Sequence, residues 1–200
     1  MQNIPAGAVP VVRDALPWPE VADAVGDYYI AQTDRGHDVR VWRARPDVPI
    51  DHRYWCFSHA TLCHWLNGFS FGVATLQTIL DDEWLPIQKK PSTGDIIVFR
   101  ATDATPEYPR GTILHAARIE SAVQSRGFRT RIRLSSKNGP RRLEIDCTPE
   151  QVERVYPDTF WYNSSCCCCC CSRSAKQYYR RIDRAIGLGP FAAMRYRWTG

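Results

Sequence analysis

The segment Pro91-Ser92-Thr93-Gly94-Asp95-Ile96-Ile97-Val98-Phe99 decides the fold of this chain. Its first five residues have the composition of a turn, because proline fixes its own φ and glycine tolerates a positive φ. Four β-branched or aromatic residues follow with no polar residue between them, which is typical of a strand buried on both faces. We therefore expect a central strand over Ile96 to Phe99, with Gly94 and Asp95 marking its entry.

Further strands are expected after this one. Ile113 to Ile119 is mostly apolar and contains His115, and Phe128 to Leu134 alternates between apolar and polar residues. Ser125-Arg126-Gly127 has the composition of the turn that joins them. Leu143 to Asp146 is expected to add a short strand. Together these segments predict an antiparallel meander.

Helical patterns precede the central strand. Apolar residues recur at helical spacing from Phe57 to Leu66, and Asn67-Gly68 is typical of a helix stop. Cys56 is thus predicted to lie at the N-terminus of this helix. A second helix is expected over Val73 to Asp82, and Pro86 discourages its continuation.

The outer parts of the chain contribute further elements. Pro17-Trp18-Pro19 predicts the start of a short helix over Glu20 to Tyr29, and Asp38 to Arg43 alternates like a strand. Thr148-Pro149-Glu150-Gln151 predicts a helix N-terminus with threonine as the cap. We expect this last helix to end near Val155.

The domain organisation follows from length and composition. The chain has 200 residues, of which 44% are hydrophobic and 12% aromatic, so it can bury one core of ordinary size. Residues 1–50 are interpreted as a lead-in that belongs to the same domain, residues 51–162 as the core, and residues 163–200 as a cysteine run with a basic tail. The order of elements predicts an α+β fold in which a small antiparallel sheet packs against the Cys56 helix.

The cysteines do not predict a disulfide framework. Six of the nine form the uninterrupted run Cys166 to Cys171, which leaves Cys56, Cys63 and Cys147 dispersed. Three scattered cysteines fit a reducing compartment better than a disulfide scaffold. The run itself has two interpretations, a site for soft metal ions or a segment derived from a repeat or an error, because it lacks the ligand spacing of defined sites.

Positive charge is concentrated at the C-terminal end. The formal net charge is +5, and Asp183 is the only acidic residue from Ser172 to Gly200. The basic residues of that tail are Arg173, Lys176, Arg180, Arg181, Arg184, Arg195 and Arg197. A helix is expected over Ala175 to Ile186. The tail is interpreted as a solvated face or arm, and we do not expect specific nucleic-acid binding because no recognition motif accompanies the charge.

No targeting or membrane segment is expected. The first ten residues, MQNIPAGAVP, lack a cationic start followed by an apolar run. No stretch approaches the roughly 18 apolar residues that a membrane-spanning helix needs. We therefore expect a cytoplasmic protein, or one exported without a cleavable signal peptide.

Cys56 and His115 are the candidate reacting groups. A cysteine at a helix N-terminus experiences the positive end of the helix dipole, which favours the thiolate. His115 is expected on a strand that packs against this helix, where it could accept the thiol proton. Asn138 and Ser136 follow the next strand and are candidates for orienting the imidazole, with Glu144 behind them.

Three segments together resemble a known superfamily. They are Tyr54-Trp55-Cys56-Phe57-Ser58-His59, the segment Pro91 to Phe99, and Leu114-His115-Ala116-Ala117-Arg118-Ile119. In this order they are similar to the NlpC and CHAP-type cysteine peptidases and amidases, and the similarity extends from Arg53 to Asn138. Cysteine before histidine matches the members whose topology is not permuted.

The resemblance implies a papain-like fold with Cys56 as nucleophile and His115 as base. Asn138, as a candidate orienting residue, completes the expected catalytic set. It implies an oxyanion site that uses the Cys56 backbone N–H, with Tyr54 nearby. Ser136 and His59 are expected beside the substrate. The implied reaction is hydrolysis of peptide or amide bonds, including those of cell-wall peptides, and no cofactor is expected.

Two alternatives remain open at this point. Cys56, His59 and Cys63 are spaced i, i+3 and i+7 on the expected helix and could share a zinc ion, with His64 as their neighbour. The chain could also be a papain-like domain without catalytic activity that serves as a binding module.

Overall fold

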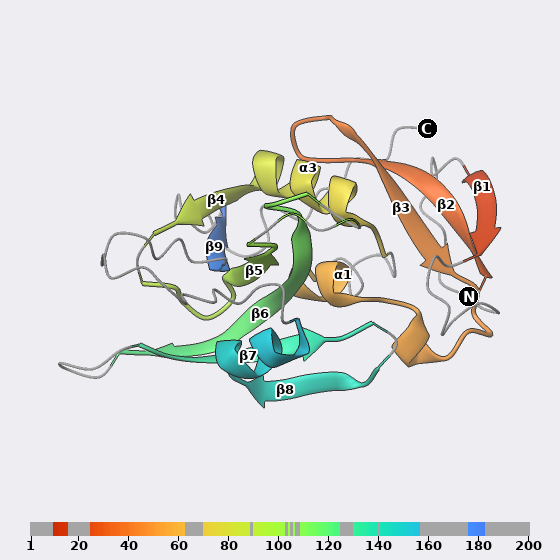
Figure 1. The fold of residues 1–200 in the computed structure, drawn as a ribbon. Coiled ribbons are helices and arrows are strands. Elements are labelled where there is room, and N and C mark those ends of the chain that lie inside the picture. The colour runs from red at the N-terminus through yellow and green to blue at the C-terminus, as the bar shows by residue number, and fades with distance from the viewer. Residues whose placement is uncertain are drawn as a thin grey trace.

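The computed structural model describes residues 10–15, 25–62, 70–88, 90–102, 104, 106, 109–124, 130–139, 141–156 and 176–182 (Figure 1). These residues form an α+β fold with two antiparallel sheets, three α-helices and a short 3-10 helix. The helices are α1 (Cys56–Ala60), α3 (Val73–Glu83) and α4 (Pro149–Val155), and the 3-10 helix is η2 (Ile50–His52). The α+β class expected from the sequence is therefore confirmed.

The larger sheet has six strands in the order β4-β9-β5-β6-β7-β8. The strands are β4 (Trp84–Ile87), β5 (Ile96–Arg100), β6 (Ile113–Val123), β7 (Arg131–Lys137), β8 (Leu143–Cys147) and β9 (Lys176–Arg181). All neighbouring strands are antiparallel, and β5 to β8 form the expected meander. The turn expected over Ser125 to Gly127 lies outside the described residues.

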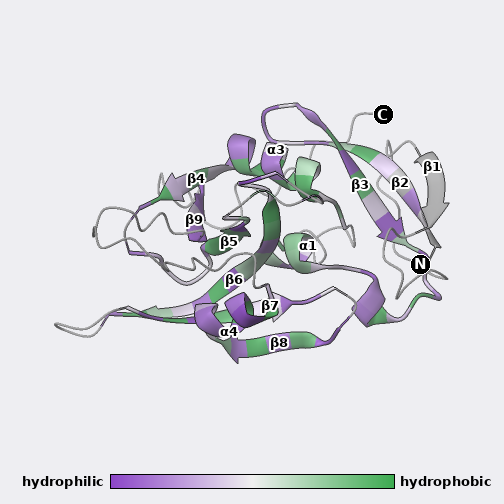
Figure 2. Cartoon of the chain, in the orientation of Figure 1, coloured by the Kyte–Doolittle hydropathy of each residue, from purple (hydrophilic) through white to green (hydrophobic). Residues whose placement is uncertain are grey.

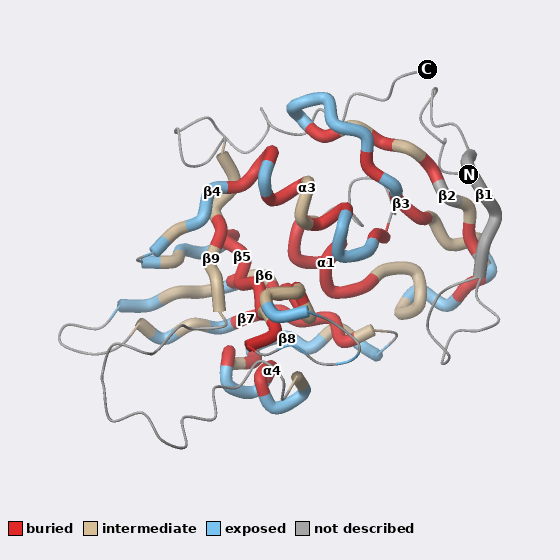
Figure 3. The backbone as a smooth tube through the Cα atoms, turned by 45° about the horizontal axis from the view of Figure 1, so that its top comes forward, coloured by how far each residue is buried: buried red, intermediate tan, exposed pale blue. Residues whose placement is uncertain are grey.

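The central strand is buried on both faces, as its composition predicts. Ile96 and Val98 pack with Ala116 in one apolar cluster, whereas Ile97 and Phe99 belong to a second cluster on the other face of the sheet. Helices α1 and α3 contribute to the first cluster, and Val152 of α4 contributes to the second. Figure 2 shows the apolar character of β5 and β6, and Figure 3 shows the buried backbone around them.

The helix expected over Glu20 to Tyr29 is wrong for the residues that the structure describes. Residues 16–24 lie outside them, and Val25–Gln32 forms strand β2. It pairs on one side with β1 (Pro10–Ala15) and on the other with β3 (Asp38–Ala44), the strand that the sequence predicts. Tyr29 and Ala31 are both buried, so the period of two that a half-buried strand requires prevails over the helical interpretation.

The basic helix expected over Ala175 to Ile186 is also wrong over Lys176–Arg181. These residues form strand β9, which inserts between β4 and β5. Tyr179 lies directly opposite Ile96 and is buried against it, while Arg180 binds Asp95. A partner 85 residues away therefore decides the conformation of this segment.

The other helices begin where their sequence signals predict. Helix α3 starts one residue after Gly72 and ends at Glu83, before Trp84 opens β4. Helix α4 has the expected capping box, in which the Thr148 hydroxyl accepts from the Gln151 N–H at 3.3 Å. Helix α1 begins at Cys56 but ends at Ala60, well before the Leu66 that the periodicity predicts, and residues 63–69 lie outside the described part.

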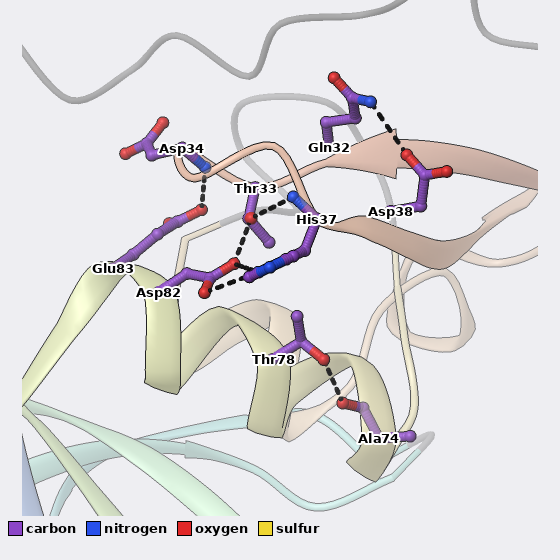
Figure 4. A network of polar contacts seen from close by, with 9 residues as sticks. All are labelled: Gln32, Thr33, Asp34, His37, Asp38, Ala74, Thr78, Asp82 and Glu83. Carbon is purple, nitrogen blue, oxygen red and sulfur yellow. Dashed lines mark hydrogen bonds and ion pairs between the residues drawn. The ribbon is translucent and has the colours of Figure 1, made fainter.

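A polar network ties the turn between β2 and β3 to the C-terminal end of α3 (Figure 4). The buried Asp82 carboxylate accepts from the Thr33 hydroxyl and contacts His37 Nδ1 at 2.9 Å. Burial raises the pKa of Asp82, but the hydrogen bonds from Thr33 and His37 lower it overall. Glu83 accepts from the Asp34 N–H at 3.2 Å and faces Arg181 at 3.7 Å. The smaller sheet is therefore anchored to the core by two carboxylates.

Replacing Glu83 with glutamine is expected to change how stability depends on pH. Burial, reinforced by the Asp34 charge and opposed by Arg181, raises the pKa of Glu83 from 4.5 to about 7. Between these values the folded state binds more protons than the unfolded state, so Glu83 makes the wild type lose stability as pH rises. Glu83→Gln should remove this pH-dependent loss in the free energy of unfolding, which is on the order of 2–3 kcal/mol. Urea denaturation at pH 5 and pH 7.5 measures it, and parallel pH dependences of the two proteins would contradict the assignment.

Candidate active site

Cys56 is the first residue of α1, and this helix packs against β6 and β7. The preceding residue, Trp55, is extended, and its backbone N–H donates to Ser58 Oγ at 3.3 Å, which closes the first turn. Backbone N–H groups of Ala116, Phe57 and Cys56 lie near the Cys56 sulfur and lower the pKa of its thiol. The start of α1 and strand β6 thus both present backbone donors to one thiol.

The thiol is nevertheless neutral in this conformation. Cys56 is 9% exposed, and burial raises the pKa of its thiol to about 12, although the three backbone N–H groups and the Lys137 charge act in the opposite direction. The sequence predicts that the helix N-terminus favours the thiolate. The donors are present as predicted, but the loss of solvation outweighs them.

His115 lies near the start of β6, directly opposite Phe99 of β5, on the face of the sheet that α4 covers. It is fully buried, and its ring stacks on Tyr156 with centroids 4.5 Å apart. Burial, with a smaller contribution from the charge of His59, lowers the pKa of His115 to about 3. The imidazole is therefore neutral at physiological pH.

A hydrogen-bonded chain leads away from the imidazole. His115 Nε2 contacts Ser136 Oγ at 2.8 Å, and Ser136 Oγ donates to Asn138 Oδ1 at 3.4 Å. Tyr156 also donates its hydroxyl to Asn138 Oδ1, at 3.3 Å, and Asn138 Nδ2 donates to Glu144 Oε1 at 3.2 Å. The structure thus places Ser136 against the ring, Asn138 behind it and Glu144 at the far end.

This chain determines which nitrogen of His115 carries the proton. A carboxylate only accepts, so Glu144 directs the amide nitrogen of Asn138 toward itself and leaves Oδ1 facing Ser136. Since Oδ1 also only accepts, Ser136 uses its single proton there and must accept from His115 Nε2–H. Nδ1 then carries the lone pair. Within the described residues Nδ1 is buried and has no hydrogen-bond partner.

The thiol and the imidazole both lie near the start of β6, on opposite faces of the sheet. The N–H of Ala116, the residue that follows His115, lies near the Cys56 sulfur. The Cys56 charge also raises the pKa of Tyr156, whose ring stacks on His115. Among the described residues no hydrogen bond joins the Cys56 sulfur to the imidazole, because the thiol arrives with α1 while the ring lies on the α4 side of the strand.

The other predicted site residues lie on the α1 side. His59 Nε2 contacts Ser135 Oγ at 2.8 Å, and Ser135 donates to Glu120 Oε1 at 2.5 Å. The centroids of the Tyr54 and His59 rings lie 6.3 Å apart. Lys137 Nζ lies 5.2 Å from the centroid of the Tyr54 ring. His59 is thus part of α1, and Tyr54 precedes the helix by two residues.

The described part of the chain contains no group of three or more His, Cys, Asp or Glu side chains placed to hold a metal ion. Of the residues in the zinc alternative, Cys63 and His64 lie outside the described residues, as does the run Cys166 to Cys171. His59 turns its Nε2 to Ser135 rather than toward a shared ion with Cys56.

Two residues of the site carry no signal in the sequence. Lys137 is fully buried, although a lysine between serine and asparagine before a glycine is typical of a solvated turn. Tyr156 ends α4 and covers His115, a contact between parts of the chain 41 residues apart that no local pattern predicts.

A cavity of about 560 Å³ lies away from this site, between the starts of β7, α4 and β9.

Comparison of this chain with protein-family models, with curated proteins and with solved structures finds no match. Within the described residues, no helix is both long and apolar enough to cross a membrane. Cys56, His115 and the residues around them are therefore the part of the molecule from which a function can be inferred.

Proposed function

We propose that this protein is a thiol-dependent hydrolase of peptide or amide bonds, with a papain-like arrangement of the NlpC type. The observation that carries the proposal is the state of His115. Its Nε2 is held by Ser136, and its buried Nδ1 has no partner among the described residues. The N–H of the next residue, Ala116, lies near the Cys56 sulfur. A buried ring nitrogen without a hydrogen-bond partner costs free energy, and a functional role would explain why the protein retains it.

The proposed reaction starts from a neutral thiol and a neutral imidazole. When a carbonyl substrate enters, Nδ1 accepts the Sγ proton and the sulfur attacks the carbonyl carbon. The N–H groups now directed at the sulfur are near the developing oxyanion and stabilise it. The imidazolium then donates its proton to the leaving nitrogen as the C–N bond breaks. Water, deprotonated by Nδ1, hydrolyses the thioester and restores the thiol.

Ser136, Asn138 and Tyr156 support the proton transfer. Ser136 accepts from Nε2–H in both protonation states of the ring, so the ring need not reorient during the cycle. The Tyr156 ring, 4.5 Å away, stacks on the imidazole. Cys56 and His115 are both buried in this conformation. The proposal therefore requires a conformational opening that brings the Cys56 sulfur and His115 Nδ1 together around the substrate.

We propose peptides as the substrate class, including cell-wall peptides, on the strength of the three sequence segments that resemble NlpC and CHAP-type enzymes. A cytoplasmic location, or export without a cleavable signal, remains a prediction from the sequence. Nucleic acid and membrane partners form no part of the proposal.

Hydrolysis and thiol labelling test the proposal together. Wild type, Cys56→Ser and Cys147→Ser would be incubated with cell-wall peptide fragments and a mixed peptide library, and new termini would be detected by mass spectrometry. Cys147 is a matched control, because it is also buried and burial raises the pKa of its thiol. We expect cleavage by wild type and Cys147→Ser, and none by Cys56→Ser.

Labelling with iodoacetamide at mildly acidic pH gives the second readout. Peptide mass spectrometry separates Cys56 from Cys147, and we expect Cys56 to react faster despite similar burial. Equal rates, together with no cleavage by wild type, would reject the hydrolase.

A binding module without catalytic activity is the second candidate, and the burial of both Cys56 and His115 favours it. It predicts that Cys56 is labelled as slowly as Cys147 and that wild type cleaves no peptide. The same experiment therefore decides between the two candidates.

A further inference from the structure

Lys137 is the last residue of β7 and lies in the sequence between Ser136 and Asn138. It is one of the largest fully buried side chains of the described core. A lysine that loses all contact with water needs replacement partners for its three N–H groups. The position between two members of the site and the burial together call for an explanation.

The ammonium is fully hydrogen-bonded by backbone carbonyls. Nζ donates to the carbonyl oxygens of Asp51 at 2.7 Å, of Gly139 at 2.8 Å and of Arg141. Three protons meet three acceptors, so the charged form satisfies every carbonyl, whereas a neutral amine would leave one unpaired. Asp51 precedes Cys56 by five residues, and Gly139 and Arg141 follow β7. One side chain thereby joins the approach to the nucleophile to the turn after Asn138.

The charge of Lys137 is also coupled to the thiol. It lowers the pKa of Cys56, and the Cys56 charge in turn raises the pKa of Lys137. Burial lowers the pKa of Lys137 to about 8, and the Asp51 carboxylate opposes that shift. The Tyr54 ring lies below Nζ, with its centroid at 5.2 Å, and Arg141 contacts Nζ through its backbone carbonyl. At pH 7 the group is a cation.

We infer that Lys137 is a positioning residue of the site: its ammonium fixes the segment before Cys56 to the turn that carries Ser136 and Asn138, and supplies positive charge to the Cys56 thiolate. This inference rests on the proposed function, since it assigns Lys137 a part in preparing the same nucleophile. The side chain acts through Cys56 and does not touch the substrate.

The test measures the pH dependence of Cys56 alkylation in wild type, Lys137→Met and Lys137→Arg. Iodoacetamide is the probe, the rate at each pH comes from peptide mass spectrometry, and Cys147 in the same molecules is the internal reference. We expect Lys137→Met to slow Cys56 alkylation by about tenfold below pH 8, where wild type carries the charge, because an opposite charge near the thiol has been removed. Lys137→Arg should keep the wild-type rate in this range, and Lys176→Met, which removes a cation paired with Glu153, should leave it unchanged.

An unchanged rate of Cys56 alkylation below pH 8 in folded Lys137→Met would overturn the inference. If circular dichroism shows that this variant does not fold, Lys137→Arg decides alone. Wild type loses the Lys137 charge above about pH 8 whereas arginine keeps it, so the ratio of Cys56 labelling in Lys137→Arg to that in wild type should rise above pH 8. A ratio independent of pH would reject the inference. Failure of the hydrolase would look different, since wild type would cleave no peptide while the effect of Lys137 on Cys56 labelling persisted.

Discussion

His115→Ala is expected to lower the rate constant for peptide hydrolysis by about 10²–10⁴-fold, the usual contribution of a general base. Nδ1 of His115 is buried without a hydrogen-bond partner among the described residues, and Ser136 fixes the proton on Nε2. Without the imidazole the Cys56 thiol keeps its proton, since burial raises its pKa to about 12. The decrease should appear in kcat/KM at neutral pH, measured with the peptide that wild type cleaves best.

His37→Ala is the control for this prediction. His37 belongs to the network between the β2–β3 turn and α3, and its side chain is 65% exposed. Its loss should leave hydrolysis unchanged. If His115→Ala retained wild-type hydrolysis while Cys56→Ser did not, another base would serve Cys56, and His115 would be a structural histidine.

The strands of the meander could be predicted because their signals are local. Ile96 to Phe99 is continuous β-branched and aromatic sequence after a turn, and the structure buries all of it. The Thr148 cap of α4 is similarly readable from four consecutive residues. Strand β9 could not be predicted, because the composition of Lys176–Arg181 suits a solvated helix and only its distant neighbours in the sheet make it a strand.

The candidate site likewise contains features that the sequence predicts and features that it does not. Cys56, His115, Ser136 and Asn138 were predicted from their positions at the ends of expected elements, and the structure places all four around one end of β6 and β7. The charge state of the thiol could not be predicted, since it depends on the burial of α1 by the sheet. The roles of Lys137 and Tyr156 depend on contacts made only after the sheet has formed.

Arg180→Leu is expected to lower the free energy of unfolding by about 3 kcal/mol, the low end of the range for breaking a buried ion pair. Asp95 is fully buried, and Arg180 holds it through Nε–Oδ1 at 2.9 Å and Nη2–Oδ2 at 2.7 Å. The low end applies because 28% of the Arg180 side chain is exposed. Urea denaturation at pH 7 measures the change, with Arg131→Leu as a control at an exposed position of β7.

The double variant Asp95→Asn with Arg180→Leu identifies the source of this loss. If the cost arises from an uncompensated buried carboxylate, removing both charges should recover most of it, because the asparagine can still accept from the Ser92 N–H that now binds Asp95 at 2.6 Å. Additive losses would instead show that each side chain stabilises the fold independently. Recovery would mean that the Gly94-Asp95 turn and β9 form one unit, and that the sheet carrying His115 depends on a strand near the C-terminal end of the chain.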